Sequence, residues 1–154
     1  MAPQQLIHAT CLAFEAVGDV AGQKIGVLLC GPSGSGKSDL ALRALHEGCA
    51  MLVSDDQTSL LVRDEQLLAS PPLTIAGRLE VRGLGLVSFP FCKEIPVKLV
   101  VDLVPQGGVE RLPEPAWIDI LGISLPKMSL YSFEASALAK LVLAMTRPDS
   151  DIDR

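Results

Sequence analysis

The chain has 154 residues, of which 49% are hydrophobic and 20% are charged, and its formal net charge is -5 at pH 7. This composition excludes a disordered tail protein, and the length is enough for one domain whose core needs no disulfide or metal ion. The negative charge argues against general affinity for nucleic acid, which depends on Lys and Arg neutralising phosphates. No apolar run is long enough for a membrane helix, and the start of the chain lacks the features of a signal peptide. We therefore expect a cytoplasmic protein with one domain over residues 1–154, including a polar tail from about 147 to 154.

The first half of the chain combines short apolar strands with one helix. Leu40, Ala41 and Ala44 recur at helical spacing, which predicts a helix from Lys37 to Glu47 that ends at a glycine. Runs of β-branched and other apolar residues, separated by turn residues, are typical of buried strands and hairpins. The strands expected here cover residues 5–14, 24–30, 49–56, 58–62 and 66–70, with a turn over 16–23.

The second half of the chain is richer in Gly and Pro. We expect the middle of 71–90 to form a strand that leads into an ordered loop, and 105–115 to form a second loop. Residues 132–145 predict a closing helix with Ser132 as its N-cap. Further strands are expected over 96–105 and 116–126. Many strands with two helices predict an α/β domain built around a mixed sheet.

The sequence GPSGSGKS, residues 31–38, matches the phosphate-loop pattern G-x-x-x-x-G-K-[ST] in full, with an apolar strand before it and a helix after it. Its glycines allow backbone N–H groups to point at phosphate oxygens, and the helix N-terminus adds a positive dipole end. Lys37 is expected to reach the β- and γ-phosphates, and the Ser38 hydroxyl to ligate Mg²⁺. The predicted nucleotide-binding residues are Gly31, Pro32, Ser33, Gly34, Ser35, Gly36, Lys37 and Ser38.

Phosphate loops occur in GTPases, motor ATPases and several kinds of kinase, so the loop alone does not select a reaction. The sequence shows no NKxD-like motif for reading a guanine base, and no arginine-rich lid of the nucleotide-kinase type. Other classes of nucleotide-binding protein stay open at this point.

Two acidic segments follow the loop. Asp55 and Asp56 come directly after an apolar strand, where they could hold a metal ion or accept a proton from an attacking hydroxyl. Glu80 and Arg82 lie two residues apart in an extended segment, so their side chains share one face before Gly83 opens a tight loop. Taken alone, the first pair is also typical of a turn, and the second of a surface salt bridge.

GPSGSGKS, VSDD and LEVRGLGLV occur in an order and spacing that resembles the catalytic domain of HPr kinase/phosphorylase. These bacterial enzymes use ATP to phosphorylate a serine of the phosphocarrier HPr, and they can remove that phosphate with inorganic phosphate. The resemblance runs from about His8 through the final helix. It implies a P-loop fold similar to phosphoenolpyruvate carboxykinase, with ATP and Mg²⁺ as cofactors and an HPr-like phosphocarrier of a phosphotransferase system as partner.

The resemblance also implies roles for single residues. Asp55 matches the proton acceptor for phosphorylation, with Asp56 beside it to support the metal or the substrate. His8 and Arg111, which would otherwise be interpreted as a structural histidine and a solvated charge, match active-site positions. The implied catalytic residues are His8, Lys37, Asp55, Asp56, Arg82 and Arg111, and the implied metal ligands are Ser38 and Glu80.

The chain departs from longer members of that family in three places. We expect a short form of the alphaproteobacterial type that consists of the catalytic domain only, without the N-terminal domain and C-terminal helix of longer members, and homo-oligomerisation stays open. The segment LYSFEAS lacks a Lys and an Arg linked to dephosphorylation, so we expect phosphorolysis to be weak or absent. Two alternatives to a serine kinase are an ATP-binding regulatory module without transfer and a carboxykinase-like small-molecule kinase.

Overall fold

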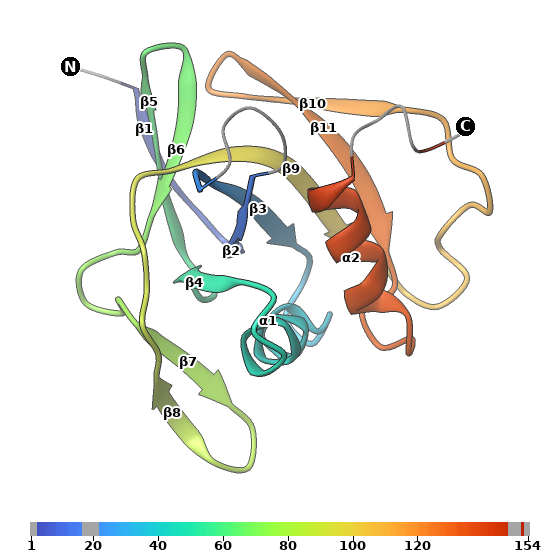
Figure 1. The fold of residues 1–154 in the computed structure, drawn as a ribbon, viewed down its shortest axis with the longest axis horizontal. Helices are drawn as coiled ribbons and strands as arrows, with labels where there is room; N and C mark the ends of the chain where they lie inside the picture. Colours follow the sequence, from blue (N-terminus) through green and yellow to red (C-terminus); the bar gives the residue numbers. More distant parts are fainter. Residues whose placement is uncertain (1–2, 17–21, 148–151, 153–154) are drawn as a thin grey trace.

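The computed structural model describes residues 3–16, 22–147 and 152 as a curled mixed sheet, a separate two-stranded hairpin and two helices (Figure 1). The expected turn over 16–23 and the expected polar tail fall mostly outside these residues. The elements are β1 (Gln4–Ile7), β2 (Thr10–Glu15), β3 (Lys24–Cys30), α1 (Lys37–His46), β4 (Met51–Ser54), β5 (Thr58–Arg63), β6 (Gln66–Ser70), β7 (Arg78–Val81), β8 (Gly85–Ser88), β9 (Ile95–Leu103), β10 (Ala116–Ile120), β11 (Ile123–Leu130) and α2 (Ala137–Thr146). The predicted mixed α/β fold is confirmed. Neither helix has the length and hydropathy needed to span a membrane, within the residues that the structure covers.

The main sheet is organised around β9. One edge of β9 pairs in parallel with β3. The other edge pairs with two strands: antiparallel with β6 near the start of β9, and in parallel with β11 from Val100 to Leu103. The sheet therefore forks at β9, with β1, β5 and β6 on one branch and β10 and β11 on the other. Because β2 runs antiparallel to both β3 and β4, the strands β3 and β4 run in the same direction and end at one edge.

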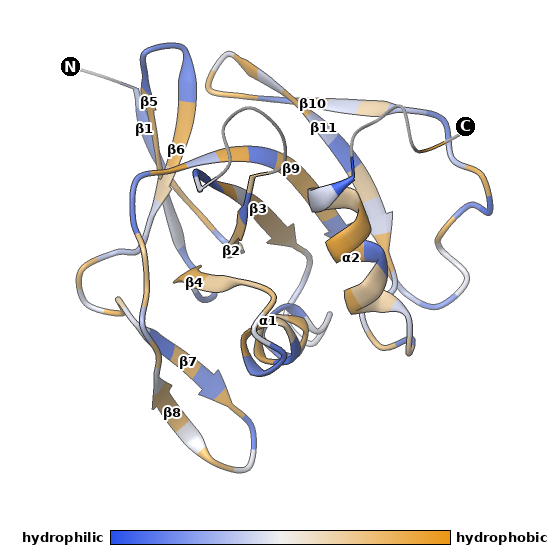
Figure 2. Ribbon diagram, viewed as in Figure 1, coloured by the Kyte–Doolittle hydropathy of each residue, from blue (hydrophilic) through white to orange (hydrophobic). Residues whose placement is uncertain are grey.

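Two apolar clusters pack on the two faces of the sheet. Leu12 and Phe14 of β2 belong to a cluster with the buried sides of α1 and α2, whereas Cys11 and Ala13 belong to a cluster with β5 and β6. Successive side chains of a strand point to opposite faces, so β2 contributes to both clusters. Burial on both faces explains why β3 and β9 read as nearly continuous apolar runs, and Figure 2 shows the hydrophobic character of β3 and α2.

The first predicted strand is in fact two strands. The chain leaves β1 at Ile7 and enters β2 at Thr10, with His8 and Ala9 between them. β1 pairs with β5, but β2 pairs with β3 and β4, so the break lets the chain pass from one branch of the sheet to the other. Apolar residues continue on both sides of this break, so the sequence pattern alone does not show that the two halves pair with different strands.

The predicted start of the second helix is wrong. Helix α2 begins at Ala137 with Ser136 in the N-cap position, not at Ser132. Ser132 is completely buried, and its hydroxyl donates a hydrogen bond to the Ser35 carbonyl, 2.5 Å away. A long-range hydrogen bond therefore replaces the local capping role that the sequence indicates.

The expected strand and ordered loop over 71–90 form the hairpin of β7 and β8, which extends away from the main sheet (Figure 1). Leu79 and Val81 of β7 are buried in the cluster that includes α1, so Glu80 between them faces the other way. The turn that follows closes with a hydrogen bond from the Leu84 N–H to the Val81 carbonyl. This packing holds Glu80 and the turn next to the N-terminal end of α1.

Candidate active site

The phosphate-loop motif lies between the end of β3 and the start of α1, as predicted. Lys37 is only 6% exposed, and its Nζ donates to the carbonyl oxygens of Gly31 at 2.7 Å and Pro32 at 3.1 Å. The first helical residue thus folds its ammonium group back over the loop. Backbone N–H groups at the start of α1 and the lysine give this loop the character of an anion site.

The segment before α2 braces the phosphate loop. Gly36 has a left-handed φ of 95°, and a Cβ at this position would overlap Ser132 Oγ. Ser132 also accepts a hydrogen bond at its carbonyl from the Arg43 guanidinium of α1. The requirement for glycine at position 36 therefore comes from both backbone conformation and the close approach of a second chain segment.

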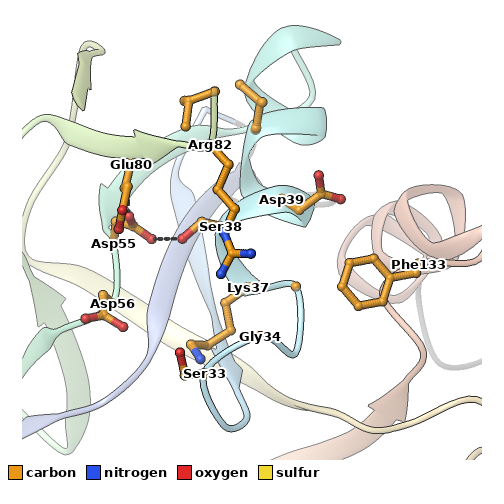
Figure 3. Close-up of a pocket in the computed structure, with 13 residues that line it drawn as sticks. Ser33, Gly34, Lys37, Ser38, Asp39, Asp55, Asp56, Glu80, Arg82 and Phe133 are labelled. Carbon is orange, nitrogen blue, oxygen red and sulfur yellow. Dashed lines mark hydrogen bonds between the residues drawn. The ribbon is translucent and has the colours of Figure 1, made fainter. Parts of the chain in front are cut away.

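Asp55 lies directly after β4 and faces the phosphate loop. Its side chain is 7% exposed and accepts three hydrogen bonds. Oδ1 accepts from Ser38 Oγ at 2.6 Å and from Thr10 Oγ1 at 3.0 Å, and Oδ2 accepts from the Glu80 N–H at 3.2 Å. Figure 3 shows the bond to Ser38, which links the acidic segment to the phosphate loop.

Asp56 lies at the rim of the site. Its backbone has a left-handed φ of 66°, and its Oδ1 is 3.4 Å from His8 Nε2. The two side chains are 61% and 52% exposed, so solvent screens this pair strongly. The two adjacent acids therefore lie in different environments. Asp55 is buried and accepts three hydrogen bonds, whereas Asp56 is exposed beside His8.

These segments surround a cavity of about 370 Å³, within the size range of small-molecule sites. Arg82 reaches from the β7–β8 turn toward the phosphate loop (Figure 3). The lining residues are Ser33, Gly34, Gly36, Lys37, Ser38, Asp39, Leu42, Asp55, Asp56, Glu80, Val81, Arg82 and Phe133. The structure thus brings together nine of the residues that the sequence singled out.

Arg111 is placed differently. It lies in the exposed loop between β9 and β10 and does not line the cavity. Among the residues that the structure describes, the contact of His8 with the site is its ion pair with Asp56. Gly31, Pro32 and Ser35 form the base of the phosphate loop without lining the cavity.

Below the loop, a second group of charges acts on Cys30, the last residue of β3. Burial raises the pKa of the Cys30 thiol, the nearby Asp102 carboxylate raises it further, and the positive charges of Lys37 and Lys127 lower it. Lys127 Nζ is 3.0 Å from Asp102 Oδ2, so these two charges largely offset each other. The thiol therefore stays protonated near neutral pH and adds no negative charge next to the phosphate loop.

The donor set at the cavity fits Mg²⁺. The Ser38 hydroxyl and the carboxylates of Asp55 and Glu80 are hard oxygen donors that line the same cavity. No cluster of three or more His, Cys, Asp or Glu side chains suited to a metal occurs among the described residues. Mg²⁺ is commonly held by one or two carboxylates together with substrate phosphates and water, so a dedicated protein cage is not required.

Sequence reasoning missed several residues at the site, namely Thr10 and four that line the cavity: Asp39, Leu42, Val81 and Phe133. Thr10 contacts both acidic residues, and Phe133, which is 55% exposed, forms part of the cavity wall. The only sequence sign of Thr10 is a hydroxyl at the start of an apolar strand. Phe133 lies in the segment that was expected to begin a helix, so its approach to the phosphate loop depends on the tertiary fold.

Comparisons with known proteins agree with this geometry. The family model described as "HPr Serine kinase C-terminal domain" matches residues 1–148. This chain belongs to that family. Proteins named HPr kinase/phosphorylase from Burkholderia cenocepacia and Paraburkholderia phymatum are each 35% identical to it over 96% of its length. The solved structure of the Hpr(Ser) kinase/phosphatase from Coxiella burnetii has a TM-score of 0.74 and 26% identity, covering 90% of this chain and 91% of that one.

The chain spans 46% of the length of those two curated relatives. The match to the family model, over residues 1–148, includes the strands, the phosphate loop and the hairpin described above. The resemblance seen in the sequence is therefore confirmed at the level of family and fold.

Proposed function

We propose that this chain is an ATP-dependent protein serine kinase that acts on an HPr-like phosphocarrier protein. The observation that carries the proposal is the hydrogen bond between Ser38 and Asp55, which places a carboxylate at the phosphate loop. The names of the relatives, HPr kinase/phosphorylase and Hpr(Ser) kinase/phosphatase, support HPr as the kind of carrier and serine as the acceptor.

We also propose that residues 1–154 act as one catalytic domain in the cytoplasm. The family model covers residues 1–148, and both apolar clusters draw on strands from either half of the chain. No stretch of the described residues forms a second core of its own.

ATP would bind with its phosphates in the loop Gly31–Ser38. The loop N–H groups, the N-terminus of α1 and the Lys37 ammonium would offset the negative charge of the β- and γ-phosphates. Ser38 and Glu80 would hold Mg²⁺, with Asp55 beside them, and the bound ion would supply further charge neutralisation. Arg82, which also lines the cavity, would add a cation near the transferred group.

In the proposed reaction the carrier serine Oγ forms a bond to the γ-phosphorus. The bond from that phosphorus to the β–γ bridging oxygen breaks, and ADP leaves. The serine proton passes to the Asp55 carboxylate, whose three hydrogen bonds hold it toward the loop. Because such transition states are largely dissociative, positioning and charge stabilisation are the main contributions of the protein.

We propose that the reverse reaction with inorganic phosphate is weak. The segment from Tyr131 to Ser136 borders the phosphate loop, yet it offers Phe133 to the cavity and contains no Lys or Arg. Phosphate bound there would lack the charged hydrogen bonds that make such sites strong. We expect little phosphate-dependent release of phosphate from phosphoserine-carrier protein, and rapid release would contradict this part of the proposal.

The kinase assignment is tested by incubating the purified chain with γ-labelled ATP, Mg²⁺ and purified HPr-like carriers. The expected result is label on a carrier serine, located by mass spectrometry. ATP binding without transfer would instead support a regulatory module, and label on a small metabolite would support a small-molecule kinase.

A further inference from the structure

One buried hydroxyl contacts both acidic residues of the site. Thr10, the first residue of β2, is completely buried. Its Oγ1 donates a hydrogen bond to Asp55 Oδ1 at 3.0 Å and accepts one from the Asp56 N–H at 3.1 Å. We infer that Thr10 is a positioning residue that sets the orientation of Asp55 and so the rate of phosphoryl transfer, an inference that rests on the proposed function.

The position of Thr10 in the sheet explains why it can do this. β2 lies between β3, which leads into the phosphate loop, and β4, which leads into Asp55. Thr10 pairs with Leu29 near the end of β3, and the neighbouring Cys11 pairs with Ser54 at the end of β4. The hydroxyl therefore projects from the strand that fixes the distance between the two halves of the site.

A hydroxyl suits this position because it is a donor and an acceptor at once. It offers its proton to the carboxylate of Asp55 and its lone pair to the backbone of Asp56. Valine has nearly the same shape but neither function, whereas serine keeps both. Thr10→Val therefore removes the hydrogen bonds while keeping the volume of the side chain, and Thr10→Ser keeps the hydrogen bonds while reducing the volume.

The backbone after Asp55 also depends on the Thr10 hydroxyl. Asp56 has a φ of 66°, and the Gln57 N–H donates to the Asp55 carbonyl at 2.7 Å, which makes a tight turn. Residues in left-handed conformations persist where their surroundings hold them, and the Thr10 oxygen is the acceptor that holds the Asp56 N–H. Loss of the hydroxyl would leave the Asp56 N–H without its acceptor and would remove one of the two hydrogen bonds to Asp55 Oδ1.

The phosphate-binding contacts do not involve Thr10. Lys37 is held by Gly31 and Pro32, and the loop is braced by Ser132. Loss of the Thr10 hydroxyl should therefore lower kcat and leave the Kd for ATP unchanged. Outer contacts of this kind change activity by about 10- to 100-fold, and we expect a decrease in that range for Thr10→Val.

The experiment measures kcat, the KM for ATP and the Kd of a non-hydrolysable ATP analogue for the full chain and three variants. These are Thr10→Val, Thr10→Ser and the control Thr58→Val. Thr58 is also completely buried, and its Oγ1 donates a 2.8 Å hydrogen bond to the Ala9 carbonyl without touching either acid. Thermal unfolding of each variant is followed in parallel, and Thr10→Ala replaces Thr10→Val if the latter does not fold.

We expect Thr10→Val to lower kcat by about 10- to 100-fold at an unchanged Kd, with Thr10→Ser near the wild-type rate and Thr58→Val less stable but active. In an Asp55→Asn background, Thr10→Val should cause no further loss, because both changes act on one group. A wild-type kcat for Thr10→Val, or a loss equal to that of Thr58→Val, would overturn the inference. Absence of transfer by the wild-type chain would instead refute the proposed function.

Discussion

Lys37 and Arg111 were both predicted as active-site residues, Lys37 from the phosphate-loop motif and Arg111 from the family resemblance, but they lie in very different settings. Lys37 is 6% exposed, donates two hydrogen bonds and is placed by the packing of β3 and α1. Arg111 lies in an exposed loop of residues 104–115, and no hydrogen bond or ion pair holds it in the part of the chain that the structure covers. The packing of the core therefore fixes the position of Lys37, whereas Arg111 has no such support.

The loop of Arg111 also differs from the cavity in how it is built. The cavity is formed by segments that are each followed or preceded by a buried strand or helix. Residues 104–115 have no regular structure beyond turns, and long irregular loops are commonly binding segments. We expect the cavity to determine chemistry and the loop to respond to the substrate.

After substitution of Asp55, the largest effect is expected from Lys37→Ala. Removal of the ammonium leaves the β- and γ-phosphates without their main side-chain cation, and we expect transfer to fall by about 10²- to 10³-fold. Initial rates of label transfer measure this. The control Lys24→Ala removes a lysine that pairs with Glu15 at the far end of β3, and it should leave the rate unchanged.

Glu80→Gln tests the metal side of the cavity. The substitution keeps the shape of the side chain but removes its charge, so we expect about a 10- to 100-fold loss at low Mg²⁺ that is partly recovered at high Mg²⁺. Rates are measured over a range of Mg²⁺ concentrations. Glu65→Gln in the β5–β6 turn is the matched control, and an identical Mg²⁺ dependence in both variants would remove Glu80 from the metal site.

Gly36→Ala tests how the phosphate loop is braced. Its Cβ would overlap Ser132 Oγ, and its left-handed φ adds backbone strain, so we expect a loss of about 1–3 kcal/mol in unfolding free energy. The control is Gly34→Ala. Gly34 also has a left-handed φ, 86°, but no atom lies within 4 Å of the Cβ that the substitution would add. Chemical denaturation of both separates strain from overlap, and equal losses would show that Ser132 does not press on the loop.

The smallest effect on rate is expected from Arg111→Ala. Because Arg111 does not line the cavity, we expect its removal to raise the KM for the carrier and to reduce kcat by less than about tenfold. Steady-state kinetics with varied carrier and varied ATP measure the two effects separately. A loss as large as that of Lys37→Ala would mean that the loop closes onto the cavity during the reaction.

The sequence predicted most of this fold because its local patterns are strong. The strands β3 and β9, the hairpin of β5 and β6, and helix α1 follow from apolar runs, turn residues and helical spacing. The break between β1 and β2 and the true start of α2 did not follow, since both depend on partners far away in the chain. Ser132 is the clearest case, because it is bonded to Ser35, 97 residues earlier.

The residues of the candidate site likewise fall into those that the sequence predicted and those that only the tertiary fold reveals. The phosphate loop and the acids at 55, 56 and 80 were found from motif and resemblance, and the structure places them around one cavity. Thr10 was missed because a threonine in a strand has no pattern that distinguishes a structural hydroxyl from one that holds an acid. Only the register of β2 against β3 and β4 reveals its contacts.

The most direct test of the account is the rate of phosphoryl transfer to carrier serine by Asp55→Asn and Asp56→Asn. Asparagine keeps the shape of each side chain but cannot accept the serine proton. We predict that Asp55→Asn loses transfer by about 10²- to 10⁴-fold while still binding ATP, and that Asp56→Asn, whose side chain is exposed beside His8, loses far less. A wild-type rate for Asp55→Asn, or a greater loss for Asp56→Asn, would contradict the assignment of Asp55 as the proton acceptor.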